Sequence, residues 1–216
     1  SGAVGALAYC FSDTFWFSAV EGEVYAMSSL FTAMVFWAMT KWYEQADRPN
    51  SSRWIVLISF LMGLSIGVHL LNLLAIPCIV FMYYYRMKED GHYTLWELVK
   101  ISLLSIVILG LMVFVLIPYI PKVAAYTDIF FVNTLHLPVN SGAAFFILAV
   151  LALCFWGVFK TYKLGKVFWN TVTLCVTTLV MGFSLFAIVI IRSSVKTPTN
   201  EYQPDNPYTL VRYLSR

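Results

Sequence analysis

Long apolar runs alternate with short polar connections along the whole chain. We predict membrane spans at about residues 1–19, 22–42, 54–68, 70–86, 98–120, 142–159 and 167–191. Most of these runs come close to the ~20 residues that a helix needs to cross a bilayer. The pattern therefore predicts an all-α polytopic membrane protein, with about seven transmembrane or half-spanning helices. We expect them to form a single transmembrane domain over residues 1–216.

One apolar stretch is too long for one span and too short for two. Residues 54–85 are almost unbroken apolar sequence, and both flanks are basic. A straight helix of this length would measure roughly 48 Å, against a hydrocarbon core of about 30 Å. We therefore predict two short helices that turn near residues 68–72, with His69 at the turn. Three residues in this stretch favour close packing or a kink: Gly63, Gly67 and Pro77.

Composition supports the membrane assignment. Hydrophobic residues make up 60% of the chain and charged residues 12%, and the mean hydropathy is +0.78. A soluble domain would have about a quarter charged residues. The net charge of +3 is small and its basic residues lie between apolar runs, so we expect no nucleic-acid partner. The four cysteines lie inside apolar segments without C-x-x-C spacing, which indicates buried thiols and no disulfide or zinc site.

Basic residues predict the orientation in the membrane. Connections 41–53, 86–100 and 160–166 contain nine of the 14 lysines and arginines, whereas 121–141 contains only Lys122. Short cytoplasmic loops are enriched in these residues. We therefore expect the first three connections to be cytoplasmic. The 121–141 connection, the start of span 22–42 and the tail from Arg192 onward then face the outside.

Three carboxylates lie close together near this outer face. Asp13, Glu21 and Glu23 belong to the stretch FSDTFWFSAVEGEVYAMSS, residues 11–29. Helix capping and first-turn placement would explain either glutamate well. They explain Asp13 less well, because a carboxylate below the interface is costly unless it faces protein or water. Unless Gly22 breaks the helix, the two glutamates would point to different faces. A functional role for at least one acid is the alternative that we favour.

Other polar residues also have two interpretations. His69, close to Asn72, is either a packing residue or a ligand contact. Arg192 ends the last apolar run, where it could snorkel to headgroups or hold a phosphate through two donors. The tail beyond it is rich in prolines, which predict an extended chain. Its hydrogen-bonding residues are Asn200, Glu201, Asp205 and Asn206.

Three blocks of the chain resemble a known family. They are SDTFWFSAVEGEVYAMSSLFTA (12–33), GLSIGVHLLNLLAIP (63–77) and NEYQPDNPYTLVRYLSR (200–216). In this order they resemble a bacterial family of protein O-mannosyltransferase-like membrane proteins, catalogued as a domain of unknown function in the GT-C glycosyltransferase superfamily. The resemblance implies a GT-C-like domain in the bacterial inner membrane, with its site on the periplasmic side. Such an enzyme moves a sugar from a polyprenyl-phosphate donor to an acceptor, often a Ser or Thr hydroxyl of an exported protein.

The resemblance also implies roles for individual residues. The family's outer acidic motif Glu-Val-Tyr falls on Glu23, with Glu21 and Asp13 in the preceding block, so these three are the implied catalytic acids. The implied substrate contacts are His69, Arg192, Asn200, Glu201 and Asp205. Its partners would be membrane lipid, the polyprenyl-phosphate sugar and the exported acceptor protein. The resemblance assigns no metal ligands and leaves a requirement for a divalent metal open.

One departure from the family pattern keeps other functions open. GT-C enzymes usually have their principal catalytic carboxylate in the first outer loop, and no span precedes the one that contains Asp13. We therefore interpret the chain as an excerpt of a larger protein, with that loop upstream and any C-terminal soluble domain absent. Such an excerpt can hold the supporting acids and the lipid-phosphate contacts of the site without its catalytic base. A transporter or flippase of lipid-linked saccharides is one alternative, although we find no internal repeat. A non-catalytic membrane assembly subunit is another.

Overall fold

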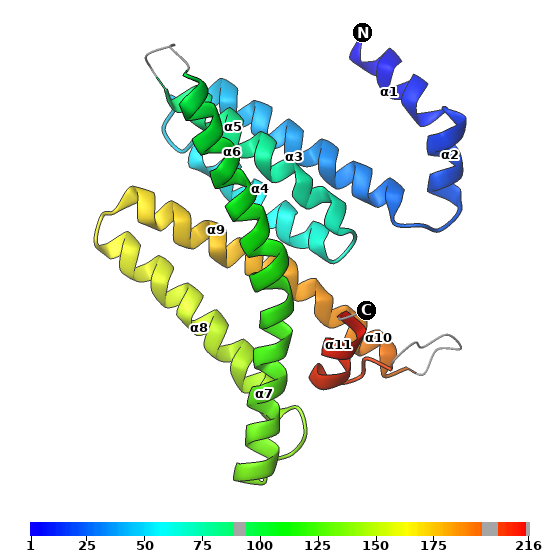
Figure 1. Cartoon of the computed structure of the whole chain (residues 1–216), viewed down its shortest axis with the longest axis vertical. Coiled ribbons are helices and arrows are strands. Elements are labelled where there is room, and N and C mark those ends of the chain that lie inside the picture. Colours follow the sequence, from blue (N-terminus) through cyan, green and yellow to red (C-terminus); the bar gives the residue numbers. More distant parts are fainter. Residues whose placement is uncertain (89–93, 196–202, 215–216) are drawn as a thin grey trace.

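The computed structural model describes residues 1–88, 94–195 and 203–214, and these ranges are helical without a strand. The α-helices are α1 (Gly2–Cys10), α2 (Asp13–Val20), α3 (Tyr25–Gln45), α4 (Ser52–Ile66), α5 (Ala75–Met87), α6 (Leu95–Gly110), α7 (Ile117–Leu135), α8 (Ser141–Lys163), α9 (Val167–Phe183), α10 (Ala187–Ser193) and α11 (Pro207–Leu214). Short turns of 3₁₀ or π-helix join some of them: η1 (Leu70–Leu74), η2 (Leu111–Leu116) and η3 (Ser184–Phe186). Figure 1 shows their arrangement.

Four helical segments in the described ranges are long and apolar enough to cross a membrane: Leu70–Met87, Leu95–Leu135, Ser141–Lys163 and Val167–Ser193. The pair α1 and α2 is a fifth candidate, bent by 61°. The chain is therefore an all-α polytopic membrane protein, as predicted. The described ranges contain four or five candidate full spans, and the predicted count of about seven transmembrane or half-spanning helices is not confirmed. The predicted span 22–42 is the helix α3, which is not among the candidates because serines, threonines and charged residues interrupt its apolar sequence.

The prediction of two short helices over residues 54–85 is confirmed. Helix α4 ends at Ile66, and η1 begins at Leu70 and continues into α5. Between them, His69 has an extended backbone with φ −160° and ψ 131°, which a continuous helix would not allow. Pro77 lies in the first turn of α5, where its missing N–H removes no helical hydrogen bond.

The core lies between α3, α4 and the η1–α5 segment. Val35 and Met39 of α3 are almost completely buried, as are Leu61 of α4 and Leu73 of η1. Trp42, near the end of α3, is also buried and stacks on Tyr83 of α5 with ring centroids 5.1 Å apart. Because lipid tails are as apolar as these side chains, close van der Waals packing holds the helices together here. These three elements form the framework on which the candidate site is built.

Helices α4 and α9 cross in close contact because both have a glycine at the crossing. A Cβ on Gly63 would lie 2.3 Å from the carbonyl oxygen of Leu179, and one on Gly182 would lie 2.6 Å from the backbone nitrogen of Leu64. Small residues permit this approach of two backbones inside a membrane. The predicted packing role of Gly63 is therefore confirmed, and its partner is Gly182.

The prediction that residues 121–141 form a connection between two spans is wrong. Residues up to Leu135 continue the helix that starts at Leu95, and only residues 136–140 connect it to α8. Pro121 lies inside α7, and the π-helical η2 absorbs an irregular turn just before it. The continuous segment has 41 residues, or about 62 Å. It is longer than a ~30 Å hydrocarbon core, so part of α7 extends beyond one face.

The tail also differs from the extended chain that its prolines predicted. Residues 207–214 form α11, which packs against α7. Asn206 caps this helix, because its side-chain oxygen accepts hydrogen bonds from the backbone N–H groups of Tyr208 (3.0 Å) and Thr209 (2.9 Å). Pro207 occupies the first helical position, where its fixed φ favours a helix start. The Asn-Pro pair therefore starts a helix.

Many helix ends gather at two sides of the view in Figure 1, and the turn from α7 to α8 lies apart from both, at the bottom. The ends of α3 and α5, the start of α6 and the turn from α8 to α9 lie toward the upper left. The α2–α3 turn, the start of η1 and α10 lie toward the right. This arrangement agrees with the prediction that the three basic connections lie on the same side of the membrane. The assignment of that side to the cytoplasm stays a prediction.

Candidate functional site

The three predicted acids lie on α2 and on the turn that joins it to α3, and all three side chains are exposed. Asp13 is the first residue of α2, and Glu21 is the residue at its C-terminal cap. Gly22 has a φ of +75°, a conformation that side chains rarely adopt, so it ends the helix as we considered. Glu23 then precedes the start of α3 at Tyr25.

This placement reverses our expectation about capping. A carboxylate in the first turn favours the helix dipole, and Asp13 occupies that position in α2. Glu21 lies at the opposite end, where the dipole disfavours a negative charge, and α3 has no acidic residue in its first turn. The first-turn position therefore explains Asp13 but not Glu21, and Glu23 lies before the N-cap of α3 without belonging to its first turn. The two glutamates are the acids that still require a role.

His69 joins the η1 turn to the beginning of α3. Its Nδ1 accepts a hydrogen bond from the backbone N–H of Leu71 at 3.1 Å, so in the neutral ring the proton is on Nε2. The imidazole lies beside Tyr25, with ring centroids 5.8 Å apart. Because Tyr25 follows Glu23 by two residues, the fold brings the histidine near the acidic turn. Nδ1 is occupied locally, which leaves Nε2 to act as a hydrogen-bond donor.

A buried polar cluster lies one turn further along α3, and the sequence analysis named only Asn72 of it. Asn72 is 3% exposed, and its Oδ1 accepts hydrogen bonds from Ser28 (3.1 Å) and Thr32. Its Nδ2 is buried without a partner among the described residues. Flipping the amide would leave the oxygen unpaired instead. The signal in the sequence was a pair of hydroxyl residues four positions apart in an apolar helix, Ser28 and Thr32, together with Asn72 in the next apolar stretch.

A hollow of about 160 Å³ lies between the bend of α1 and α2 and the first turns of α3. We call it the hydroxyl hollow, because six of its seven lining side chains carry a hydroxyl group: Tyr9, Ser12, Thr14, Ser18, Tyr25 and Ser29, with Phe15 as the seventh. Tyr25 also contacts His69, so the hollow and the histidine share one residue. Its polar but uncharged lining suits a neutral ligand with several hydroxyl groups.

The remaining predicted residues lie elsewhere. Arg192 is exposed in the last turn of α10, which Figure 1 shows apart from the α2–α3 turn. Asp205 is exposed just before α11, where its Oδ1 accepts a hydrogen bond from Asn206 Nδ2 at 2.9 Å. Asn200 and Glu201 lie outside the described residues. The structure thus brings Glu21, Glu23 and His69 into one region, and it does not bring Arg192 or Asp205 to them.

Sequence reasoning missed the buried carboxylate of Asp128. It is 8% exposed, and it accepts hydrogen bonds from the backbone N–H groups of Asn140 (3.1 Å), Gly142 (2.9 Å) and Ala143 (3.4 Å). Asp128 therefore caps the N-terminus of α8 from α7. The weak signal in the sequence was a lone Asp in an apolar helix followed by Asn-Ser-Gly. Its saturated contacts indicate a structural role.

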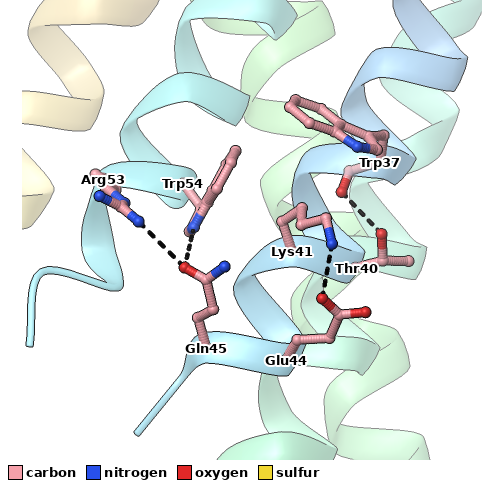
Figure 2. A network of polar contacts seen from close by, with 7 residues as sticks. All are labelled: Trp37, Thr40, Lys41, Glu44, Gln45, Arg53 and Trp54. Carbon is pink, nitrogen blue, oxygen red and sulfur yellow. Dashed lines mark hydrogen bonds and ion pairs between the residues drawn. The ribbon is translucent and has the colours of Figure 1, made fainter. Parts of the chain in front are cut away.

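The polar network at the other end of α3 also has a structural role (Figure 2). Gln45 Oε1 accepts hydrogen bonds from Arg53 (3.2 Å) and from the Trp54 indole N–H (3.1 Å), which joins the end of α3 to α4. Lys41 and Glu44 form an exposed ion pair of 2.9 Å on α3 itself. In the described ranges, no group of three or more His, Cys, Asp or Glu side chains is placed to hold a metal ion.

Residues 1–92 match a family described as protein O-mannosyl-transferase TMEM260 N-terminal domain. No curated protein and no solved structure matches the chain. The matched range contains α1 to α5, the hydroxyl hollow, His69, Asn72 and all three predicted acids. It contains neither Arg192 nor the tail. The match supports an O-mannosyltransferase-like family for the part of the chain in which the structure gathers the acidic turn, the histidine and the hollow.

Proposed function

We propose that the chain is the membrane part of a glycosyltransferase that moves a sugar from a polyprenyl-phosphate donor to an extracytoplasmic acceptor. The acceptor that we propose is a Ser or Thr hydroxyl of an exported protein, and the membrane is a bacterial inner membrane with the site on its periplasmic side. One observation supports this proposal. The range similar to an O-mannosyltransferase domain is the range that contains the acidic turn, His69 and the hydroxyl hollow.

The chemistry assigns Glu23, or Glu21 beside it, as the general base. The carboxylate takes the proton from the acceptor hydroxyl as the oxygen attacks the anomeric carbon of the sugar. The bond from that carbon to the phosphate oxygen breaks, and polyprenyl phosphate leaves with the electron pair. His69 is a suitable donor to the leaving phosphate, because Nδ1 already accepts a bond from Leu71 and Nε2 can donate. The lipid tail stays in the bilayer, so the transfer occurs at the interface.

Arg192 is the second phosphate contact in this proposal. A guanidinium can engage two phosphate oxygens at once, which a lysine cannot. Its place at the end of α10 is apart from the acidic turn, so its contribution is separable from that of Glu23. If Arg192 only snorkels to headgroups, its removal leaves transfer intact. Asp13, Asn200, Glu201 and Asp205 remain proposed contacts of the substrates.

Transfer assays on purified variants of the full-length protein, which includes the upstream loop, test the proposal. We expect Glu23→Gln and Arg192→Ala each to reduce transfer from one polyprenyl-phosphate mannose donor by about a hundredfold, since each removes a charged contact of the transition state. The matched controls are Glu44→Gln and Arg53→Ala, whose side chains lie at the other end of α3 and at the start of α4.

The controls should keep normal rates, and all four variants should unfold near the parent temperature. Normal transfer by Glu23→Gln would remove the catalytic assignment. If only Arg192→Ala is normal, the site is confined to the matched range. Binding of the donor without transfer by the full-length parent protein would favour a flippase or an assembly subunit.

A further inference from the structure

We infer that the hydroxyl hollow binds the sugar ring of the ligand, as a neutral polyhydroxylated six-membered ring, and that it excludes the phosphate. This inference rests on the proposed function and deepens it, because it assigns residues outside the acidic turn to recognition of the sugar. It follows from the hydrogen-bonding capacity of the lining, from its aromatic rings, from its charge and from its position.

The hydroxyl groups of the lining divide into acceptors and donors. Ser12, Ser18 and Ser29 donate their protons to backbone carbonyl oxygens, at 2.8, 2.9 and 2.9 Å. Their oxygens therefore keep lone pairs that can accept a further hydrogen bond. Tyr9 and Tyr25 add phenol groups at its edge, and each can donate. A ligand that fits must both donate and accept several hydrogen bonds, as the hydroxyl groups of a sugar do.

Aromatic rings supply an apolar surface next to these groups. Tyr9 and Phe15 pack with ring centroids 4.4 Å apart, and both line the hollow. The C–H face of a sugar ring is apolar and can lie against such rings while its hydroxyl groups reach the serines. The volume of about 160 Å³ is well below that of a pocket for a drug-sized molecule. It suits one ring, and any further residues of a saccharide would lie outside the hollow.

The charges around the hollow disfavour an anion. No lysine, arginine or histidine is among its lining residues. Asp13 lies between two of those residues in the chain, and Glu21 and Glu23 lie on the turn just before Tyr25. A phosphate in the hollow would meet acidic neighbours without a cation to balance it. A neutral ring meets no such repulsion, and the phosphate is left to the groups outside the hollow.

The position of the hollow agrees with this division. Tyr25 lines the hollow on one side and contacts the His69 ring on the other. Ser29 follows Ser28, whose hydroxyl bonds to the buried Asn72. The hollow therefore adjoins the acidic turn and the histidine, the two groups that the proposed reaction uses at the anomeric carbon. A ring bound there has its reactive bond near the boundary between the hollow and these groups.

Direct binding of methyl α-D-mannopyranoside to the chain tests the inference. Saturation-transfer NMR measures weak binding, and an amphipol must hold the protein, because glucoside or maltoside detergents would compete. We expect the parent to bind and Ser29→Ala and Thr14→Val each to weaken binding roughly three- to tenfold, as for loss of one hydrogen bond. The matched controls are Ser102→Ala and Thr171→Val. Ser102 of α6 donates to the carbonyl four residues earlier at 2.8 Å, as Ser29 does, and Thr171 is a helical threonine of α9 outside the hollow.

The controls should bind like the parent, and inorganic phosphate should not compete with the glycoside. Equal binding by the hollow variants and the controls would overturn the inference, as would competition by phosphate or no glycoside binding by the parent. The proposed function fails separately. Glycoside binding that depends on Ser29 and Thr14, without transfer in the donor assay, would support sugar binding in the hollow and contradict the proposed transferase activity. Transfer that is unaffected by both hollow variants would leave the proposed transferase activity in place and contradict a role of the hollow in sugar recognition.

Discussion

Asp128 and the acids of the α2–α3 turn show how burial and partners decide the role of a carboxylate. The side chain of Asp128 is enclosed, and the N-terminus of α8 supplies its hydrogen bonds. Gly142 is needed for this contact, because a Cβ there would lie 2.4 Å from the Cα of Asp128. Glu21 is exposed instead at the C-terminal end of α2, where the helix dipole disfavours a negative charge. Glu23 is exposed just before α3, and it is neither the N-cap of that helix nor in its first turn. A carboxylate that has no structural role in the fold is the better candidate for a catalytic role.

We predict that Asp128→Ala lowers the thermal stability of the protein. The change leaves buried N–H groups of α8 without an acceptor, which costs about 1–3 kcal/mol. The control is Glu44→Ala, which breaks an exposed ion pair worth at most about 1 kcal/mol. Thermal unfolding in one detergent, followed by circular dichroism, compares the two. Equal shifts of the two midpoints would mean that the Asp128 cap does not stabilise α8.

At this scale the sequence predicted which residue types matter better than it predicted their contacts. The break at Gly22 and the place of His69 followed from local rules of chain geometry. The bond from Asn72 to Ser28 and the cap from Asp128 to α8 join residues 44 and 14 positions apart. Such pairs depend on the three-dimensional packing of helices, which local patterns do not encode.

Among the helices, the crossing of α4 and α9 sets the tightest geometric requirement. Gly63 and Gly182 face each other there, and a methyl group on either would collide with the backbone of the other helix. Inside a membrane, such close packing replaces the hydrophobic effect as the force between helices. The crossing therefore joins the α3–α5 framework to the second half of the molecule, and it fixes the position of α9.

We predict that Gly63→Ala and Gly182→Ala both destabilise the protein, although alanine is the better helix former by about 1 kcal/mol. The helices must separate to fit the methyl group, and overpacking of this kind costs roughly 1–3 kcal/mol. Gly157→Ala is the control, because the nearest atom to its new Cβ is a side-chain carbon at 3.7 Å. It should be neutral or stabilising in the same unfolding assay. A stabilising effect at Gly63 would contradict the close crossing.

The helices themselves were predictable where apolar runs are clearly bounded, as in residues 54–85. They were not predictable where a proline misleads. The predicted span 98–120 stopped just before Pro121, yet α7 continues through this proline after an irregular π turn. Pro207 suggested an extended tail, yet with Asn206 as a cap it starts α11. A proline stops a helix in its interior and favours one at its first position, so its effect depends on a boundary that the sequence alone leaves uncertain.

For the whole molecule, composition was sufficient to predict the class, because a chain with 60% hydrophobic residues and 12% charged residues cannot cover an apolar surface of this size in water. The number of spans was less predictable, since α3 and α4 are apolar but fall short of a full span by composition or length. The 41-residue segment α6–α7 sets the long dimension of the molecule (Figure 1). The side of the membrane that each end faces decides whether the acidic turn and the hollow meet the periplasm.

We predict that cysteines introduced at Ser51 and Asn133 are labelled from opposite sides of the membrane. Ser51 lies at the start of α4 in a basic connection, and Asn133 is exposed near the end of α7. The nine basic residues of the three short connections place the first in the cytoplasm. Cys10 is exposed and must first be changed to serine, and that parent is the background control. An impermeant maleimide applied to right-side-out vesicles should label Asn133→Cys, and applied to inverted vesicles it should label Ser51→Cys. Labelling of both from one side would contradict the predicted orientation. The acidic turn and the hydroxyl hollow would then no longer be expected to face a periplasmic acceptor, as the proposed reaction requires.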